Sequence, residues 1–304
     1  MARYWCARLV QTSIASFTQA HSYSLMPIPM HDHLKSRSAH DHERRGRVLI
    51  VFDVGNTETT IGLFDGALLV AHWRIMTDVA RTADEFGILL RNLLAASSVP
   101  HDRVTAAAIG SVVPPITDPL AKACALYLHA EPVIVDARAP LPIRLDVEEP
   151  LTVGADRLIN TLAASRLYAR DTICVDLGTA TTFDCITADG VFLGGVIMPG
   201  VRTSADTLTR RTSKLPATEL VPPKQIIGKR TEECIRAGVL FGAAEAIDGI
   251  VRRIKADWPN AAVPLVVATG GLAEVLQPFC SQFDRVEPFL TLEGLRMAHE
   301  ILTA

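Results

Sequence analysis

One pattern occurs twice in this chain: an apolar, strand-like run that ends in Asp-X-Gly and leads into a hairpin. The first copy is VLIVFDVG, with Asp53, and the second is TICVDLG, with Asp176, about 120 residues further on. An Asp-Gly pair, a strong hairpin signal, follows each copy, at residues 65–66 and 189–190. A duplication on this scale predicts two similar domains that face each other across a cleft.

The elements between the two copies indicate a mixed α/β fold. In the first half, helical spacing over residues 83–97 and 116–129 alternates with short apolar runs at residues 106–114 and 132–136. In the second half, we expect helices over residues 154–169, 233–258 and 290–302 and a strand over 264–271. Strands joined first as hairpins and then through helices do not follow the strict βαβ alternation of a dinucleotide-binding fold. We expect a first domain over residues 48–150 and a second over 151–304.

Composition restricts the class of protein. The 304 residues are 49% hydrophobic and 21% charged, with a formal net charge of -3, which gives no basic excess for nucleic acid. No apolar run reaches the roughly 18 residues that a membrane span needs. The six scattered cysteines form no CxxC pair, so we expect reduced thiols and a cytoplasmic enzyme. From the charge and the short apolar runs, we expect neither a nucleic-acid nor a membrane partner.

Residues 1–47 differ from the rest of the chain. They hold five of the nine histidines and show no sustained hydrophobic period. A metal-binding tract is one interpretation of HDHLKSRSAHDH. A solvated, disordered extension, or residues translated from an early start codon, is the interpretation that we favour.

The two turns carry groups that suit phosphates. In DVGNTET, which begins at Asp53, a carboxylate at a strand end can hold a cation or water, and Gly55 allows a tight bend. Asn56, Thr57 and exposed backbone N–H groups can donate to phosphate oxygens. DLGTATT, which begins at Asp176, offers the same elements.

A third motif, GADR, leads directly into a predicted helix. Phosphorylation of an alcohol needs an acceptor for the hydroxyl proton and a donor that anchors the acceptor molecule. Asp156 and Arg157 fit these two roles. The alternative is that Asp156 caps the helix and Arg157 pairs on its surface.

Two predicted strands end in glycine-rich sequence. The two motifs are GGVIMPG (residues 194–200) and ATGG (residues 268–271), and each either approaches a nucleotide or forms a plain turn. The chain contains neither GxGxxG nor GxxxxGK[ST], which disfavours the Rossmann and P-loop folds.

The ordered set DVGNT, RTADEF, GSVVP, GADRLIN, VDLGTATTFD, GGVIMPG, IGKRT, TGGLA and LTLEGL resembles the type III pantothenate kinases. The resemblance runs from about residue 48 to the C-terminus. It implies two actin-like (ribonuclease H-like) domains, each a mixed five-stranded sheet with helices, facing across a cleft. It also implies transfer of the γ-phosphoryl group of ATP to pantothenate, the first step of coenzyme A biosynthesis, by a homodimer.

The resemblance also assigns roles to residues. Asp156 would be the proton acceptor, and Asp176 would bind a monovalent cation (K⁺ or NH₄⁺), with Mg²⁺ arriving on ATP. The residues implied to contact ATP are Asp53, Val54, Gly55, Asn56, Thr57, Glu58, Thr59, Thr60 and Thr179. Those implied to contact pantothenate are Gly154, Ala155, Asp156, Arg157 and Thr231.

Two positions depart from the family pattern. Val147 stands where many members have Tyr, and Glu58 stands where many have Asn, so that a carboxylate would face the phosphates unless it points away or meets a cation. The alternatives are a catalytically weak accessory factor, an actin-like kinase for another small hydroxylated acceptor, and a filament-forming actin-like protein, which the short chain disfavours.

Overall fold

The protein is described by a computed structural model, in which residues 48–97 and 99–304 are placed well enough to describe. The predicted extension over residues 1–47, with its histidine-rich tract, lies outside the described residues. Within the described part, no helix is both long enough and apolar enough to cross a bilayer. The five cysteines in this part are free thiols.

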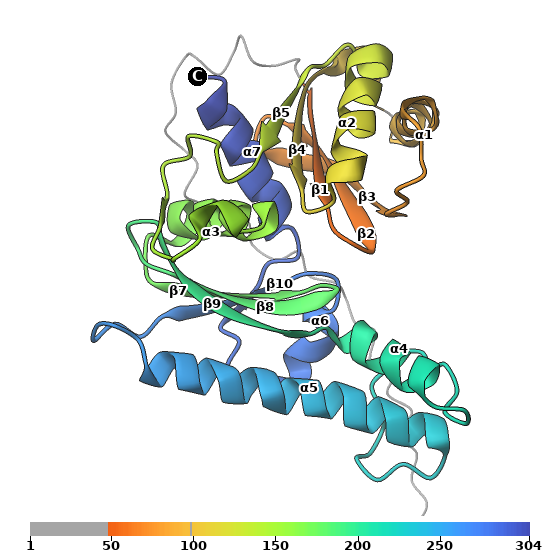
Figure 1. Ribbon diagram of the computed structural model, residues 1–304, viewed down its shortest axis with the longest axis vertical. Helices are drawn as coiled ribbons and strands as arrows, with labels where there is room; N and C mark the ends of the chain where they lie inside the picture. Colours follow the sequence, from red (N-terminus) through yellow and green to blue (C-terminus); the bar gives the residue numbers. More distant parts are fainter. Residues whose placement is uncertain (1–47, 98) are drawn as a thin grey trace, which may run out of the picture. The chain divides into compact units, whose positions relative to one another are not determined.

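The first sheet contains the first Asp-X-Gly strand at its centre (Figure 1). Its strands are β1 (Val48–Val54), β2 (Glu58–Asp65), β3 (Leu68–Met76), β4 (Val104–Ser111) and β5 (Pro132–Val135), in the order β3-β2-β1-β4-β5. β1, β2 and β3 pair antiparallel, as consecutive hairpins must, whereas β4 and β5 pair parallel after helical crossovers. Gly66, with φ +62, turns the β2–β3 hairpin as predicted.

The second sheet repeats this order. Its strands are β6 (Arg144–Leu145), β7 (Thr172–Leu177), β8 (Ala180–Ile186), β9 (Val191–Pro199), β10 (Leu265–Thr269) and β11 (Arg285–Val286). The order is β11-β10-β7-β8-β9-β6, which is the first sheet's arrangement with β6 added beside β9. The duplication is therefore confirmed. The expected five strands are wrong for this sheet, which has six, because the two-residue β6 is too short to leave a sequence pattern.

Within residues 48–97 and 99–304, seven α-helices accompany the sheets (Figure 1). They are α1 (Ala83–Ala96), α2 (Pro114–Ala123), α3 (Ala155–Tyr168), α4 (Val201–Arg211), α5 (Thr231–Ala256), α6 (Ala273–Leu276) and α7 (Leu290–Leu302). The start of α1 is fixed by a capping box, since the Thr82 side chain accepts from the Glu85 N–H and the Glu85 carboxylate accepts in return from the Thr82 N–H. α4 was not predicted.

Two helices join the halves. Buried side chains of α3 and α7, among them Ile159 and Leu295, form one cluster with Val51 and Ala108 of the first sheet. Figure 1 shows α7, the last helix of the chain, beside β4 and β5. The first sheet therefore completes its core with sequence from the second half. The domain division at residue 150 stays a prediction.

Candidate active site

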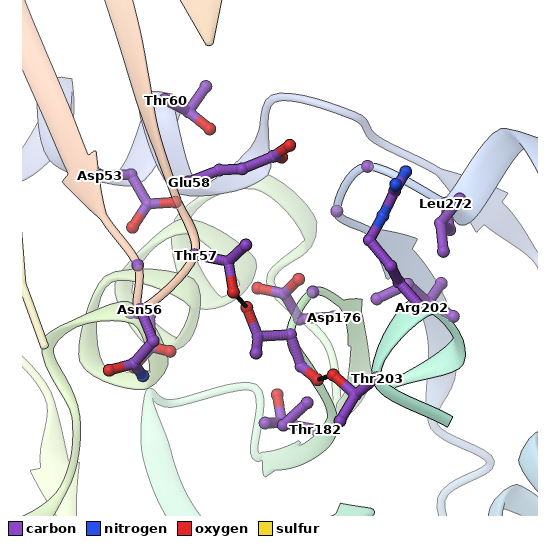
Figure 2. Close-up of a pocket in the computed structure, with 18 of the residues that line it drawn as sticks. Asp53, Asn56, Thr57, Glu58, Thr60, Asp176, Thr182, Arg202, Thr203 and Leu272 are labelled. Atoms are coloured by element: carbon purple, nitrogen blue, oxygen red, sulfur yellow. Dashed lines mark hydrogen bonds between the residues drawn. The ribbon is translucent and has the colours of Figure 1, made fainter. Parts of the chain in front are cut away.

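A cavity of about 250 Å³ lies where the two Asp-X-Gly turns meet (Figure 2). Both sheets contribute to its lining, together with α3, α4 and the turn after β10. Nine of the residues proposed from the sequence line it: Asp53, Gly55, Asn56, Thr57, Glu58, Thr60, Asp156, Asp176 and Thr179.

The first turn is held by its own backbone and by the end of β3. The Gly55 N–H donates to the Glu58 carbonyl at 3.1 Å, and the Thr77 hydroxyl donates to the Gly55 carbonyl at 2.7 Å. Val54 and Thr59 were predicted to contact ATP, but their side chains are buried at 0% and 2% exposure and do not line the cavity. They alternate with the lining residues because successive strand residues point to opposite faces.

The second turn is built in the same way and is anchored by α4. The Gly178 N–H donates to the Ala180 carbonyl at 3.0 Å. The Thr179 carbonyl then accepts from the Gly200 N–H at 3.1 Å and from the Thr203 hydroxyl at 2.6 Å. The N-terminus of α4 is thereby fixed against the turn, and Arg202 and Thr203 of its first turn line the cavity.

The two turns touch each other. The Thr179 hydroxyl donates to the Thr57 hydroxyl at 2.9 Å, and Figure 2 shows this contact between the two loops. The expectation that the repeated motifs converge on one cleft is met by this hydrogen bond between residues 122 positions apart.

Four aspartates line the cavity, and the charges of three of them, Asp53, Asp156 and Asp176, repel one another. Burial is the largest cause that raises the pKa of Asp53 well above its usual value, and the charges of Asp176 and Asp156 add to it. The pKa of Asp176 rises to about 6 for the same reasons, although the Asn160 amide donates to its carboxylate at 3.3 Å. A cation in the cavity would relieve this repulsion.

Asp156 stands in the first turn of α3, where the sequence placed it. Its carboxylate accepts from the Arg157 N–H at 2.8 Å, and burial is the main cause that raises its pKa. A side chain at Gly154 would put Cβ 2.5 Å from Asp156 Oδ1, so glycine leaves room for the carboxylate. Gly154 and the buried Ala155 shape this position but do not line the cavity.

Arg157 does not line the cavity. Its Nε donates to Asp184 Oδ1 at 2.6 Å, and its guanidinium lies over the Phe192 ring at 4.9 Å. Asp184 has no exposed side-chain surface, and burial raises its pKa to about 7 against the opposing effect of Arg157. Within the described residues, Arg157 Nη2 and Asp184 Oδ2 are buried without a hydrogen-bond partner. The interpretation of Arg157 as a surface-paired residue is therefore wrong.

Thr231 lies elsewhere. It lines a separate cavity of about 690 Å³ between α4 and α5, with mostly apolar neighbours such as Leu208 and Ile235. In one copy of the chain, Thr231 and Asp156 do not share a cavity.

Several lining residues were missed in the sequence. They are Arg74, Val112, Arg202, Thr203, Asp206 and Leu272, whereas Leu177, Gly178, Ala180 and Thr182 belong to the predicted DLGTATT loop. Figure 2 shows the Arg202 side chain extending from α4 toward the turn that carries Leu272. Arg74 gave no local signal, because its role depends on strand pairing. Gly270 and Gly271 of ATGG do line the cavity, which favours the nucleotide interpretation of that motif over a plain turn.

The carboxylate oxygens suit hard cations such as Mg²⁺ and K⁺. Among residues 48–97 and 99–304, no group of three or more His, Cys, Asp or Glu side chains could by itself hold a metal ion. The fit therefore rests on the donor chemistry of Asp53 and Asp176, whose pKa values are raised by burial first and by neighbouring carboxylates second.

Solved structures share the fold at low sequence identity. A Campylobacter jejuni protein described as a Baf family transcriptional activator aligns with a TM-score of 0.52 at 15% identity, covering 83% of this chain and 98% of that one. A reductive activator for corrinoid, iron-sulfur protein aligns with a TM-score of 0.51 at 12% identity, covering 86% and 61%. At these identities the likeness shows the fold alone.

Sequence comparison is more specific. The family model for type III pantothenate kinase matches residues 49–253. A type III pantothenate kinase of Anaeromyxobacter sp. (strain K) is 44% identical over 253 residues, which cover 83% of this chain and 99% of that protein. The Roseiflexus sp. (strain RS-1) enzyme of the same name is 43% identical over 254 residues, covering 84% and 99%. The chain therefore belongs to the type III pantothenate kinase family.

Proposed function

We infer that the protein phosphorylates pantothenate with ATP to give 4′-phosphopantothenate and ADP, the first step of coenzyme A biosynthesis. The observation that carries this inference is the joining of the two Asp-X-Gly turns around one cavity that also contains Asp156, in a chain of this family.

In the proposed step, the 4′-hydroxyl oxygen of pantothenate forms a bond to the γ-phosphorus of ATP. The bond between that phosphorus and the oxygen bridging to the β-phosphate breaks, and ADP leaves with the electron pair. The hydroxyl proton passes to the Asp156 carboxylate and then to solvent. Burial raises the pKa of this carboxylate, which makes it a better proton acceptor.

The two Asp-X-Gly turns would bind and position the triphosphate. Asn56, Thr57 and Thr179 have side chains that can donate to phosphate oxygens, and Gly55 brings backbone close to the ligand. We assign Asp53, Val54, Glu58, Thr59 and Thr60 to the same phosphate loop. Val54 and Thr59 support it from its buried face.

Asp176 would hold the monovalent cation, K⁺ or NH₄⁺, and Asp53 would face Mg²⁺ on the nucleotide. Bound cations would offset the charge that develops on the transferring phosphoryl group. The raised pKa values of both aspartates support this assignment, since a cation favours their ionised forms.

The acceptor site is assigned to residues 154–157 and Thr231. Because Thr231 lies in a different cavity from Asp156 within one chain, a contact from Thr231 to pantothenate fits a homodimer in which the partner supplies it. Cytoplasmic location, and the lack of nucleic-acid and membrane partners, stay predictions from composition.

A coupled ADP-release assay tests this function. With ATP, Mg²⁺ and K⁺ present, pantothenate should stimulate ADP release, whereas glucose, N-acetylmannosamine and acetate should not. Turnover with a sugar or acetate instead would favour another actin-like kinase. ATP binding without turnover on any acceptor would favour the accessory factor.

A further inference from the structure

The cavity that would bind a triphosphate is itself rich in acid. Five carboxylates line it, from Asp53, Glu58, Asp156, Asp176 and Asp206, against two arginines, Arg74 and Arg202. Every uncompensated carboxylate lowers the affinity for a polyanion. Bound cations can offset the charges of the half-buried Asp53, Asp156 and Asp176, whereas Glu58, with a side chain 42% exposed, needs its own compensation.

Strand pairing supplies that compensation. Thr60 of β2 lies opposite Arg74 of β3, and Glu58 lies opposite Met76. Glu58 and Arg74 are therefore diagonal neighbours on one face of the hairpin, within reach of each other. Arg74 Nε lies 3.5 Å from Glu58 Oε2.

The other end of the guanidinium reaches across to the second half of the protein. A Cβ added at Gly271 would lie 3.0 Å from Arg74 Nη1 and 3.3 Å from Nη2. The turn after β10 thus leaves room for Arg74 between Glu58 and the cavity wall. The Arg74 side chain is 51% exposed, and its guanidinium lies at the edge of the cavity between Glu58 and Gly271.

We propose that Arg74 is the counter-charge that allows the phosphate cavity to accept ATP despite Glu58. This inference rests on the proposed function, because it takes the cavity to be the ATP phosphate site. An exposed ion pair contributes little to the free energy of folding. We therefore expect the Arg74–Glu58 pair to affect the affinity for ATP rather than the stability of the fold.

A double-mutant cycle on Mg-ATP binding tests the proposal. The variants are Arg74→Ala, Glu58→Gln and both together, and the dissociation constant is measured by ligand-detected NMR titration without pantothenate. We expect Arg74→Ala to weaken binding about tenfold because Glu58 is left unpaired. Glu58→Gln should tighten binding about threefold, and the double variant should recover at least half of the Arg74→Ala loss on a logarithmic scale.

Arg103→Ala is the matched control. Arg103 forms a similar half-exposed pair with Asp65, at 3.0 Å, at the far end of β2 from Glu58 and outside the cavity lining. Its removal should leave ATP binding unchanged. Equal ATP affinity in Arg74→Ala and wild type, or recovery of less than half of the loss in the double variant, would overturn the proposal.

The two inferences can fail separately. An enzyme that binds Mg-ATP but does not phosphorylate pantothenate refutes the proposed function and leaves the cycle measurable. If pantothenate turnover is normal but the Arg74 and Glu58 substitutions show no coupling in ATP binding, only the counter-charge proposal is refuted.

Discussion

At the scale of single residues, the proposed chemistry centres on Asp156. Its carboxylate lines the same cavity as Asp53 and Asp176, and Gly154 has no side chain that would displace it. The motif GADR predicted a carboxylate at this position, but it did not predict the orientation of the neighbouring Arg157. Arg157 points to Asp184, 27 positions later, and no local pattern shows that two such residues will meet in a core.

Asp156→Asn is the residue-scale prediction. We expect kcat to fall by about 10²–10⁴-fold, because the amide cannot take the hydroxyl proton, while Mg-ATP affinity is retained or increased by the loss of a repulsive charge. Steady-state kinetics and an ATP titration measure the two effects. Asp102→Asn, outside the cavity lining, is the control. If Asp156 served only the helix end, the variant would lose about 1 kcal/mol of stability and keep its turnover.

At the scale of elements, the sequence predicted the strands better than the helices that pack beside the cavity. Apolar runs and Asp-Gly pairs predicted both hairpins, because strand alternation and turn chemistry are local properties. α4 escaped because VRTSADTLTRR is mostly polar and contains several threonines, which are weak helix formers, and because hydrogen bonds to Thr179 place it. Arg202 and Thr203 escaped with it, so the sequence revealed the two loops but not the helix that supports the second one.

Gly154→Ala tests the start of α3. The added Cβ, 2.5 Å from Asp156 Oδ1, would force the carboxylate to move, so we expect activity to fall at least tenfold. Gly249→Ala on α5 is the matched control, since its Cβ would meet nothing closer than Arg252 Nη2 at 3.9 Å. It should preserve activity and raise stability by up to about 1 kcal/mol through helix propensity. Equal activity in both variants would show that the position of Asp156 does not depend on Gly154.

At the scale of the whole molecule, the buried carboxylates make stability depend on pH. The pKa of Asp184 is raised to about 7 and that of Asp176 to about 6, and the pKa of Asp53 is also raised, mainly by burial. A carboxyl with a raised pKa stabilises the folded state at pH values below its unfolded pKa. That contribution is lost as the pH rises through the folded pKa.

We therefore expect the free energy of unfolding of the ligand-free protein to fall as the pH rises from 5 to 8. Carboxyls with lowered pKa values, such as Glu85 and Asp171, have completed their ionisation below this window. Urea unfolding at several pH values measures the slope, and K⁺ with Mg-ATP should reduce it by favouring the ionised forms. Stability that rises over this range would contradict the electrostatic account.

We propose that two turns from opposite halves of the chain hold one triphosphate beside Asp156. A crystal structure with a non-hydrolysable ATP analogue and pantothenate tests it most directly. We predict phosphate oxygens in contact with both turns and the pantothenate 4′-hydroxyl within hydrogen-bonding distance of the Asp156 carboxylate. A triphosphate that contacts one turn alone, or a hydroxyl remote from Asp156, would contradict it.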